Sequence, residues 1–271
     1  MNNSTIGAAV SMSSLQQRLD IIADNIANMN TNGYKSKEGS FEDVLTRVQQ
    51  QSKDYDQPGR SMPLGFNIGF GVRVPTVTSN WEEGTLQETG KPTDLALQGN
   101  GLFGVQVNGA TAYTRQGNFH FTPDTANKNR MILVDNTGNP VLNTNGNPLT
   151  VGANVSAAID ERGQVWTKTD EKQPPVLAGS LMIVEPLSRS ALQAVDGNFY
   201  VLADGVTTQQ AFKGAAEPST VGVRTGYLES SNVDLSREMT EMMQIQRTYQ
   251  LAARALSSSD QMLGLANNMR A

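Results

Sequence analysis

The two ends of the chain carry the strongest periodic pattern in the sequence, and this pattern limits the folds open to it. Near the N-terminus, apolar residues recur at spacings of three and four, which is the period of one face of an α-helix. The residues of this stripe are Met12, Leu15, Leu19, Ile22, Ile26 and Met29. It predicts a helix from about Ser4 to Asn30, roughly 40 Å long at 1.5 Å per residue. Asn32-Gly33 is the expected stop, because both residue types tolerate left-handed backbone.

A second stripe with the same period occupies the C-terminal end. Its residues are Leu235, Met242, Ile245, Tyr249, Ala252, Leu256, Leu263 and Ala266. Asn232 or Asp234 is expected to cap the start of this helix, which would run from Asp234 to Met269 over about 50 Å. Neither stripe has a partner in its own half of the sequence. We therefore expect the two helices to pack together as a coiled-coil-like pair and to contact copies of the same chain.

The middle of the chain changes to strands and turns. Val72–Val74 and Val105–Val107 alternate with a period of two, and Leu181–Val184 is typical of a buried strand. Tight-turn dipeptides of the kind that close hairpins occur at Asn108-Gly109, Asn145-Gly146, Asp196-Gly197 and Asp204-Gly205. These features predict a mostly antiparallel β domain.

The fold class predicted from these patterns is α+β, with long N- and C-terminal helices and a β domain inserted between them. The expected division is a discontinuous terminal helical domain over 1–35 and 226–271, an extended polar linker or hairpin over 36–75, and a β-rich outer domain over 76–225.

Composition removes several classes of function. The chain has no cysteine and a single histidine, and its net charge is −5. Thiolate and multi-histidine metal sites are excluded, and no basic face is available for nucleic acid. No apolar run approaches the roughly 18 residues of a membrane-spanning helix, and no cleavable signal peptide is visible. We expect no metal, no cofactor and no membrane insertion.

Three local motifs suggest chemistry, and each has a plainer interpretation. Gly99–Gly104 matches the dinucleotide pattern G-x-G-x-x-G, but the alternating residues after it predict a strand where that motif requires a helix. His120 lies in a strand-like context without a second histidine or cysteine to assist it. Asp135–Gly138 and Asp160–Gly163 lack the ligand spacing of a calcium loop, so turns are the better interpretation. We therefore expect no catalytic residues.

Four blocks of sequence resemble one known family. The segment Ala23–Lys35, with Asn25, Ala27, Asn28, Thr31, Gly33, Tyr34 and Lys35, resembles the N-terminal signature of flagellar rod and hook proteins. Its one departure is Asp24, where the family more often has asparagine. Pro92–Phe103, Tyr113–Phe119 and Gly226–Asp234 are similar to further family blocks, in the expected order.

The resemblance implies a structural role. A family member would be a subunit of the flagellar basal-body rod, which assembles into a hollow, torque-transmitting shaft for motility through its terminal helices. It would leave the cell through the flagellar export apparatus, without a cleaved signal peptide, and would contact copies of itself and other rod and hook subunits. The length and the segment Leu64–Arg73 favour the distal rod subunit. A proximal rod or hook-type subunit is the alternative, ahead of a secreted β-rich binding module or an enzyme.

Overall fold

The computed structural model describes residues 2–39, 42–43, 72–73, 77–124, 127, 129–153, 155–168, 174–195, 198–213 and 221–268. The fold is α+β, and every pairing between described strands is antiparallel, as predicted. The chain divides into two compact units. The helical unit consists of Met1–Ala27, Ser36–Asn80 and Val233–Ala271, and the β unit consists of Asn28–Lys35 and Trp81–Asn232.

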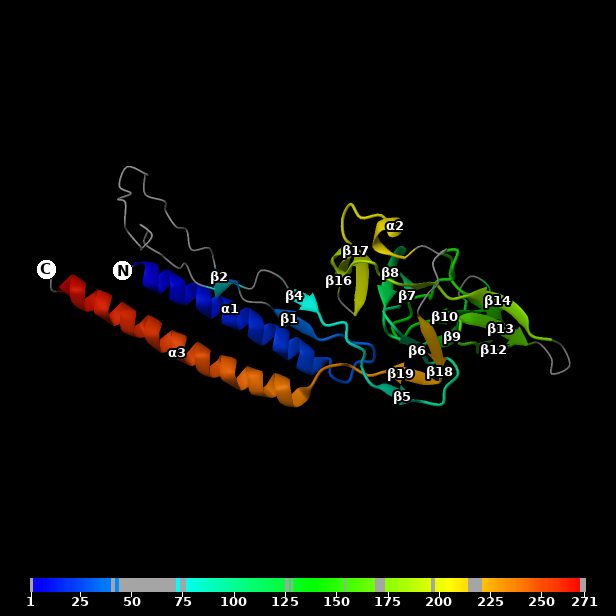
Figure 1. The fold of residues 1–271 in the computed structure, drawn as a ribbon, viewed down its shortest axis with the longest axis horizontal. Helices are drawn as coiled ribbons and strands as arrows, with labels where there is room; N and C mark the ends of the chain where they lie inside the picture. The colour runs from blue at the N-terminus through cyan, green and yellow to red at the C-terminus, as the bar shows by residue number, and fades with distance from the viewer. Residues whose placement is uncertain are drawn as a thin grey trace, which may run out of the picture. The chain divides into compact units, whose positions relative to one another are not determined.

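The described part of the helical unit consists of two long helices and two small strand pairs. Its elements are α1 (Asn2–Ala27), β1 (Lys37–Gly39), β2 (Glu42–Asp43), β3 (Val72–Arg73), β4 (Val77–Ser79) and α3 (Leu235–Asn268). Strand β1 pairs with β4, and β2 pairs with β3. The two helices lie side by side and run in opposite directions (Figure 1).

Both predicted helices form, with one correction. Helix α1 ends at Ala27, before the expected stop at Asn32-Gly33. A turn replaces the last helical residues, in which the Thr31 N–H donates to the Asn28 carbonyl over 3.0 Å. At the start of α3, the Asp234 carboxylate accepts the N–H of Ser236 at 2.9 Å, so Asp234 is the cap. The predicted last residue of this helix, Met269, lies outside the described residues.

The described residues of the β unit form five groups of paired strands. The largest is a five-stranded sheet with β15 (Ile183–Val184), β7 (Leu102–Val107), β8 (Ala110–Thr114), β17 (Phe199–Leu202) and β16 (Leu192–Val195) in that order. Two three-stranded sheets are β11 (Thr150–Gly152), β10 (Arg130–Val134) and β9 (His120–Pro123), and β12 (Ser156–Ile159), β13 (Gln164–Lys168) and β14 (Val176–Ser180). Two pairs are β18 (Gly222–Thr225) with β6 (Leu95–Gln98), and β19 (Tyr227–Glu229) with β5 (Leu86–Glu88). A 3-10 turn, η2 (Arg189–Ala191), and a short helix, α2 (Thr208–Ala211), complete the unit.

Strand β7 is the centre of the β unit because both of its faces are buried. Successive side chains of a strand point to opposite faces. Phe103 and Val105 belong to one hydrophobic cluster, where the Phe103 ring meets Phe119 edge-on at 5.1 Å. Leu102 belongs to a second cluster, which also contains Trp81. The sequence Leu-Phe-Gly-Val therefore joins two parts of the core.

The turn predictions are confirmed where the structure describes them. Asn108 and Gly109 have φ angles of 50° and 82° and close the hairpin between β7 and β8. Gly146 and Gly205 also have positive φ. Asp196-Gly197 and Val74 lie outside the described residues, and of Leu181–Val184 only Ile183–Val184 forms a strand. Leu181 instead makes an isolated bridge.

The motifs that could suggest chemistry have structural roles. Strand β7 begins directly after the first glycines of Gly99–Gly104, so no helix follows them. His120 is exposed at the start of β9. The Asp135 carboxylate accepts the N–H groups of Thr137 at 2.9 Å and Asn139 at 2.8 Å, as a turn residue does. Among the described residues no group of three or more metal-ligating side chains occurs, and none of the helices described is long and apolar enough to span a membrane.

Candidate functional site: the helical pair and a buried ion cluster

The apolar stripe of α1 is most deeply buried at Ile22, which is 2 % exposed. Met12, Leu15, Leu19 and Ile26 are half-buried along the same helix, and Met29 lies beyond its end. On α3, Ile245 is the only buried residue among those whose burial is described. Met242, Tyr249 and Leu256 are half-buried, Leu235 is exposed, and the side chain of Leu263 lies outside the described part of the chain.

Polar contacts set the axial position of α1 relative to α3. Arg18 of α1 forms an ion pair with Glu241 of α3. Asn25 of α1 donates to Glu238 of α3 at 3.4 Å. Because the helices are antiparallel, the later residue of α1, Asn25, contacts the earlier residue of α3, Glu238.

Asn25 also holds the strand that follows the helix. Its Nδ2 donates to the Lys37 carbonyl at 2.9 Å, and its Oδ1 accepts the Lys37 N–H at 2.8 Å. Asn25 is 1 % exposed, so an amide is needed here that can donate and accept at once. Asp24, the departure from the family pattern, forms an ion pair with the Lys37 ammonium at 2.6 Å.

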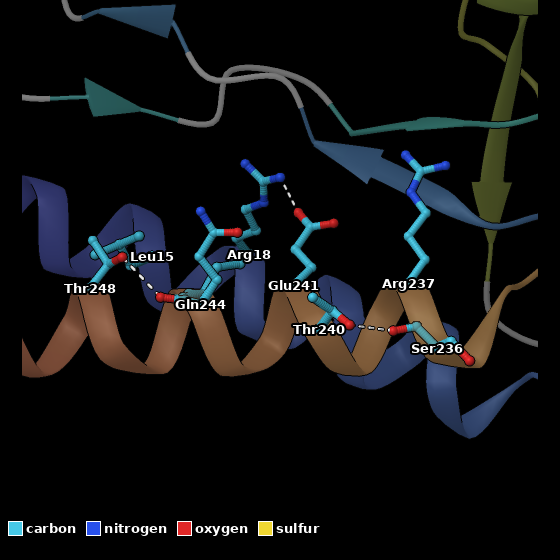
Figure 2. A pocket seen from close by; sticks show the side chains of 9 residues that line it. Leu15, Arg18, Ser236, Arg237, Thr240, Glu241, Gln244 and Thr248 are labelled. Carbon is cyan, nitrogen blue, oxygen red and sulfur yellow. Dashed lines mark hydrogen bonds and ion pairs between the residues drawn. The ribbon is translucent and has the colours of Figure 1, made fainter.

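A groove runs along the helical pair. It has a volume of about 710 Å³ and is lined by Leu15, Arg18, Ser236, Arg237, Thr240, Glu241, Gln244, Ile245 and Thr248. Figure 2 shows Arg18 reaching Glu241, with Gln244 and Arg237 on the same side of α3.

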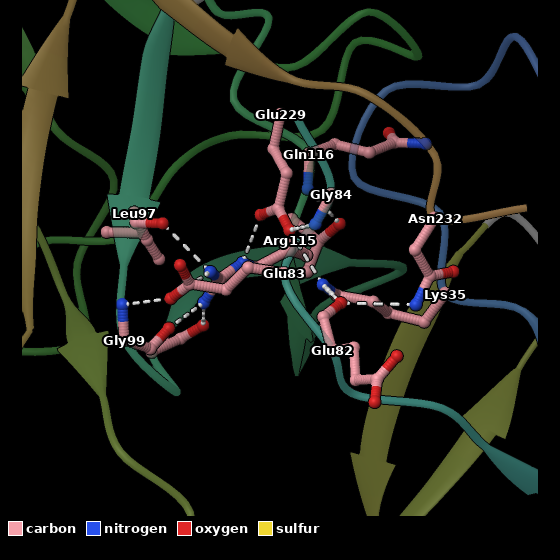
Figure 3. Close-up of polar contacts among 12 residues, drawn as sticks. Lys35, Glu82, Glu83, Gly84, Leu97, Gly99, Arg115, Gln116, Glu229 and Asn232 are labelled. Atoms are coloured by element: carbon pink, nitrogen blue, oxygen red, sulfur yellow. Dashed lines mark hydrogen bonds and ion pairs between the residues drawn. The ribbon is translucent and has the colours of Figure 1, made fainter. Parts of the chain in front are cut away.

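In the β unit, three charged side chains from distant parts of the chain meet in the interior (Figure 3). The Lys35 ammonium lies 2.6 Å from Glu229 Oε1, and Arg115 Nε lies 2.5 Å from Glu229 Oε2. All three side chains are at most 2 % exposed. We call Lys35, Arg115 and Glu229 the ion cluster.

Backbone carbonyls accept further hydrogen bonds from the two cations of the ion cluster, and Glu83 Oε1 lies 3.8 Å from Arg115. Arg115 donates to the carbonyls of Gly99 and Gly101, each at 2.6 Å, and of Leu97 at 2.8 Å. Lys35 donates to the Glu82 carbonyl at 2.6 Å. The dinucleotide-like glycine segment therefore presents its carbonyl oxygens to an internal guanidinium, which is the opposite polarity to a phosphate site.

Burial and the neighbouring charges shift the pKa values of Lys35 and Glu229. Burial lowers the pKa of Lys35 below its ordinary value of 10.5, although the neighbouring Glu229 opposes that shift. Burial alone would raise the pKa of Glu229, but Arg115 and Lys35 outweigh it and hold the pKa below its ordinary value of 4.5. Glu229 is therefore ionised at neutral pH and neutralises two cations.

Glycines let the backbone segments around the cluster approach closely. The Gly33 N–H donates to the Glu229 carbonyl at 2.7 Å, and a Cβ on Gly33 would lie 2.6 Å from the Arg115 carbonyl. A Cβ on Gly84 would lie 1.9 Å from the Ser230 carbonyl, and one on Gly117 would lie 1.6 Å from the Leu95 carbonyl. Gly33 is thus a point of close approach, whereas the sequence interpretation made it part of a helix stop.

The sequence-predicted motif residues divide between the two units. Asn25 and Ala27 belong to the helical unit, whereas Thr31, Gly33 and Lys35 belong to the β unit. Asn28 accepts the Thr31 hydroxyl at 3.2 Å within the connecting turn, and Tyr34 is buried at 4 % exposure.

Arg115 and Glu229 were not among the predicted site residues. The sequence signal that could have found them is a charged residue at the end of a short strand-like segment, as in Ala112–Arg115 and Tyr227–Glu229. Such a charge is buried only when it has a partner. The sequence does not reveal which partner that is.

The three segments that form the ion cluster coincide with three family models. Residues 8–35 match the model "Flagella basal body rod protein". Residues 96–167 match "Flagellar hook protein FlgE/F/G D1 domain", and residues 224–269 match "Flagellar basal body rod FlgEFG protein C-terminal".

Full-length relatives agree with these matches. The chain is 31 % identical to the flagellar hook-basal body complex protein FlhP of Bacillus subtilis (strain 168), with 100 % of both chains covered. It is 32 % identical to the flagellar basal-body rod protein FlgG of Borreliella burgdorferi, with 97 % of each chain covered. The chain belongs to the flagellar basal-body rod protein family. Another member, FlgG of Bacillus subtilis (strain 168), is 32 % identical over 96 % of each chain.

Each segment that is characteristic of this rod family supplies one charge of the ion cluster. Lys35 is the last residue of the N-terminal match, Arg115 lies in the D1 match, and Glu229 lies in the C-terminal match. The family signatures, which are far apart in sequence, therefore meet in one buried contact of this rod-family chain.

Proposed function

We propose that this chain is a structural subunit of the bacterial flagellar basal-body rod, and most similar in role to the distal rod subunit. In this role it assembles with copies of itself and with other rod and hook subunits into a hollow shaft that transmits torque for motility. The observation that carries the proposal is the end-to-end similarity to FlgG proteins, at 32 % identity over 97 % of both chains in one case.

The helical unit is the proposed assembly element. The stripe residues Met12, Leu15, Leu19, Ile22, Ile26, Met29, Leu235, Met242, Ile245, Tyr249, Leu256 and Leu263 would form coiled-coil-like contacts within and between copies. Half-buried apolar residues on both helices support this, because their uncovered surface becomes stabilising once a neighbour covers it. At about 25 cal/mol per Å², covering roughly 300 Å² gives about 7 kcal/mol before the ordering cost of association.

The remaining parts of the proposal follow from rod-family membership. The chain acts without catalysis or a cofactor, is exported through the flagellar export apparatus without a cleaved signal peptide, and works outside the cytoplasm. The division into terminal helical domain, linker over 36–75 and β-rich outer domain over 76–225 is part of this proposal.

A proximal rod or hook-type subunit is the second candidate. The identity to FlhP, a hook-basal body complex protein, is 31 %, close to the 32 % for FlgG of Borreliella burgdorferi, and covers 100 % of both chains. The D1 model that matches residues 96–167 also spans FlgE, FlgF and FlgG.

Deletion of the gene, followed by imaging of purified basal bodies, tests the proposal. We expect non-motile cells whose basal bodies lack the distal part of the rod. Loss of the proximal part instead would favour the second candidate, and intact rods with normal motility would contradict both.

Point variants test the role of the helices. Leu19→Asp and Leu256→Asp should each block rod assembly and motility while the β unit still folds. Gln17→Asp and Ser257→Asp change exposed residues on the same two helices and are the matched controls. Normal motility in both leucine variants would argue strongly against assembly through the helical stripes.

A further inference from the structure

Helix α3 carries an exposed apolar edge next to its contact with α1. Leu235, Met239 and Met243 follow one another at intervals of four residues, and they are 37 %, 52 % and 53 % exposed. Residues spaced by four line up as a ridge along a helix surface. We call these three residues the methionine ridge. Two of its members are long and unbranched, so they can adapt to an uneven partner surface.

The groove described above (Figure 2) is lined by other residues of the same stretch of α3. Leu15 and the buried Ile245 give it an apolar floor. Thr240, Gln244 and Thr248 line it from α3, again at intervals of four residues. The groove therefore has the direction and spacing that receive a ridge of the same type.

Four polar side chains of the groove are already paired, so an apolar side chain can cover these groups at little cost. The Thr240 hydroxyl donates to the Ser236 carbonyl at 2.7 Å, and the Thr248 hydroxyl donates to the Gln244 carbonyl at 2.9 Å. Arg18 and Glu241 neutralise each other. Covering an unpaired polar group would cost about 1–3 kcal/mol, and these groups avoid that cost.

A single copy cannot place its own ridge in its own groove. Met239 directly precedes Thr240, and Met243 directly precedes Gln244. Adjacent residues of an α-helix point about 100° apart around its axis. Ridge and groove thus face different directions on one rigid helix, and only a second molecule can bring a ridge to the groove.

We propose that the methionine ridge of one copy packs into the groove of the next copy in the assembled rod. This inference rests on the proposed function as a self-assembling subunit. Because ridge and groove are different surfaces, the contact is heterologous: each copy offers a ridge to one neighbour and a groove to another. Contacts of this type continue into an open filament, whereas a contact between two identical surfaces closes as a dimer.

Disulfide crosslinking tests this contact without background, because the chain has no cysteine. Two differently tagged chains are produced together in motile cells. One carries Met239→Cys in the ridge, and the other carries Gln244→Cys or Thr248→Cys in the groove. After oxidation, rods are isolated and examined for products that contain both tags. Repeating the series with Met243→Cys guards against a local disturbance by any one substitution.

We expect crosslinks between ridge and groove cysteines, and none when either variant is present alone. Gln261→Cys, an exposed position of the same helix well beyond the C-terminal end of both surfaces, should not link to Met239→Cys. A double variant Met239→Cys with Gln244→Cys in one chain should give a ladder of products longer than dimers. Dimers from single variants, crosslinks only to other proteins, or no ridge–groove crosslink in rods from motile cells would each overturn the proposal. These results would leave the role as a rod subunit standing, because motility is measured in the same cells.

Discussion

The Lys35 ammonium and the Glu229 carboxylate lie 2.6 Å apart in the interior of the β unit, although 194 positions separate them in the sequence. Their side chains are 1 % and 2 % exposed. Two ions removed from water in this way must remain paired, because either one alone in the interior is strongly destabilising. The ion cluster of the β unit therefore forms only when the segments that carry Lys35 and Glu229 pack against the segment that carries Arg115.

Replacing Glu229 with glutamine should destabilise the β unit by about 3–5 kcal/mol, the usual cost of breaking a buried ion pair by removing one partner. The variant leaves Lys35 and Arg115 as two adjacent buried cations without their buried anion, and Glu83, which lies 3.8 Å from Arg115, is 49 % exposed. Urea denaturation followed by the fluorescence of Trp81 and Trp166, which both belong to the β unit, measures the loss. Glu88→Gln, at an exposed site of the neighbouring strand β5, is the control and should change stability by less than about 0.5 kcal/mol. Equal stability of the two variants would contradict a structural role for the ion cluster.

The lowered pKa of Glu229 predicts that the free energy of unfolding depends on pH in the acid range. Burial disfavours the charge on Glu229, but Arg115 and Lys35 outweigh it, so its folded-state pKa lies below the ordinary value of 4.5. The folded state then binds this proton less readily than the unfolded state. The stabilisation is complete above the ordinary value and is lost as pH falls through the folded-state pKa. The stability difference between the native chain and Glu229→Gln should therefore be constant near neutral pH and narrow in acid. A difference that stays constant from about pH 7 to about pH 3 would show that Glu229 does not titrate in this way.

The helices could be predicted from sequence because the spacing of apolar residues by three and four is a property of each helical segment alone. The stripe that contains Ile22 needs no knowledge of its partner. The predicted end of α1 was wrong because Asn28 and Thr31 form a turn that competes with the last helical turn. Gly33 suited a helix stop equally well by its conformational freedom, and only the close approach of Arg115 distinguishes the two roles.

The ion cluster could not be predicted because its members share no local pattern. Arg115 and Glu229 are each a single charge at the end of a strand, a position in which most charged residues face solvent. The dinucleotide-like glycines were correctly predicted to lead into a strand and not into a helix, but the hydrogen bonds that their carbonyls accept from Arg115 depend on a distant segment. Contacts of this kind follow from the tertiary fold and not from spacing.

Gly117 should be intolerant of any side chain. An added Cβ would lie 1.6 Å from the carbonyl oxygen of Leu95, which is backbone and cannot move aside. We expect Gly117→Ala to destabilise the β unit by about 3 kcal/mol or more, because segments around the ion cluster must separate. In Gly222→Ala, the new Cβ would meet only the Gln98 side chain at 3.8 Å, so its stability should change by about 0.5 kcal/mol or less. Thermal unfolding of both variants compares them, and similar midpoints would contradict the close approach of these backbone segments.

Asn25 should be required for the stability of the helical unit. Asn25→Ala leaves both the N–H and the carbonyl of Lys37 without their partners in a site that is 1 % exposed. An unsatisfied buried polar group costs about 1–3 kcal/mol, so a loss of that size is expected in helix melting followed by circular dichroism. Asn30→Ala, an exposed position in the following turn, is the control. Aspartate at position 25 keeps the acceptor but loses the donor, so Asn25→Asp should also be destabilised. If it melts like the native chain, the amide donor is unnecessary.

The helical unit of the isolated chain should open more readily than the β unit. In α3, Ile245 is the only buried residue among those whose burial is described, and large apolar residues such as Leu251 and Met262 are 64 % and 61 % exposed. Residues Leu95, Phe103 and Val105 of the β unit are 0 % exposed. Helices gain most of their stability from tertiary packing, and local opening is easiest where few apolar contacts hold an element.

Amide hydrogen exchange compares local opening of the helical unit with that of the β unit. In the monomer, we expect amides of α3 to exchange at least about tenfold faster than those of β7, a difference of about 1.4 kcal/mol in opening free energy. In assembled rods, the protection of α3 should rise toward that of β7, because neighbouring copies cover the exposed apolar residues of the helix. Equal protection of both elements in the monomer would mean that the helical pair is stable alone, and assembly would then supply contacts but not order.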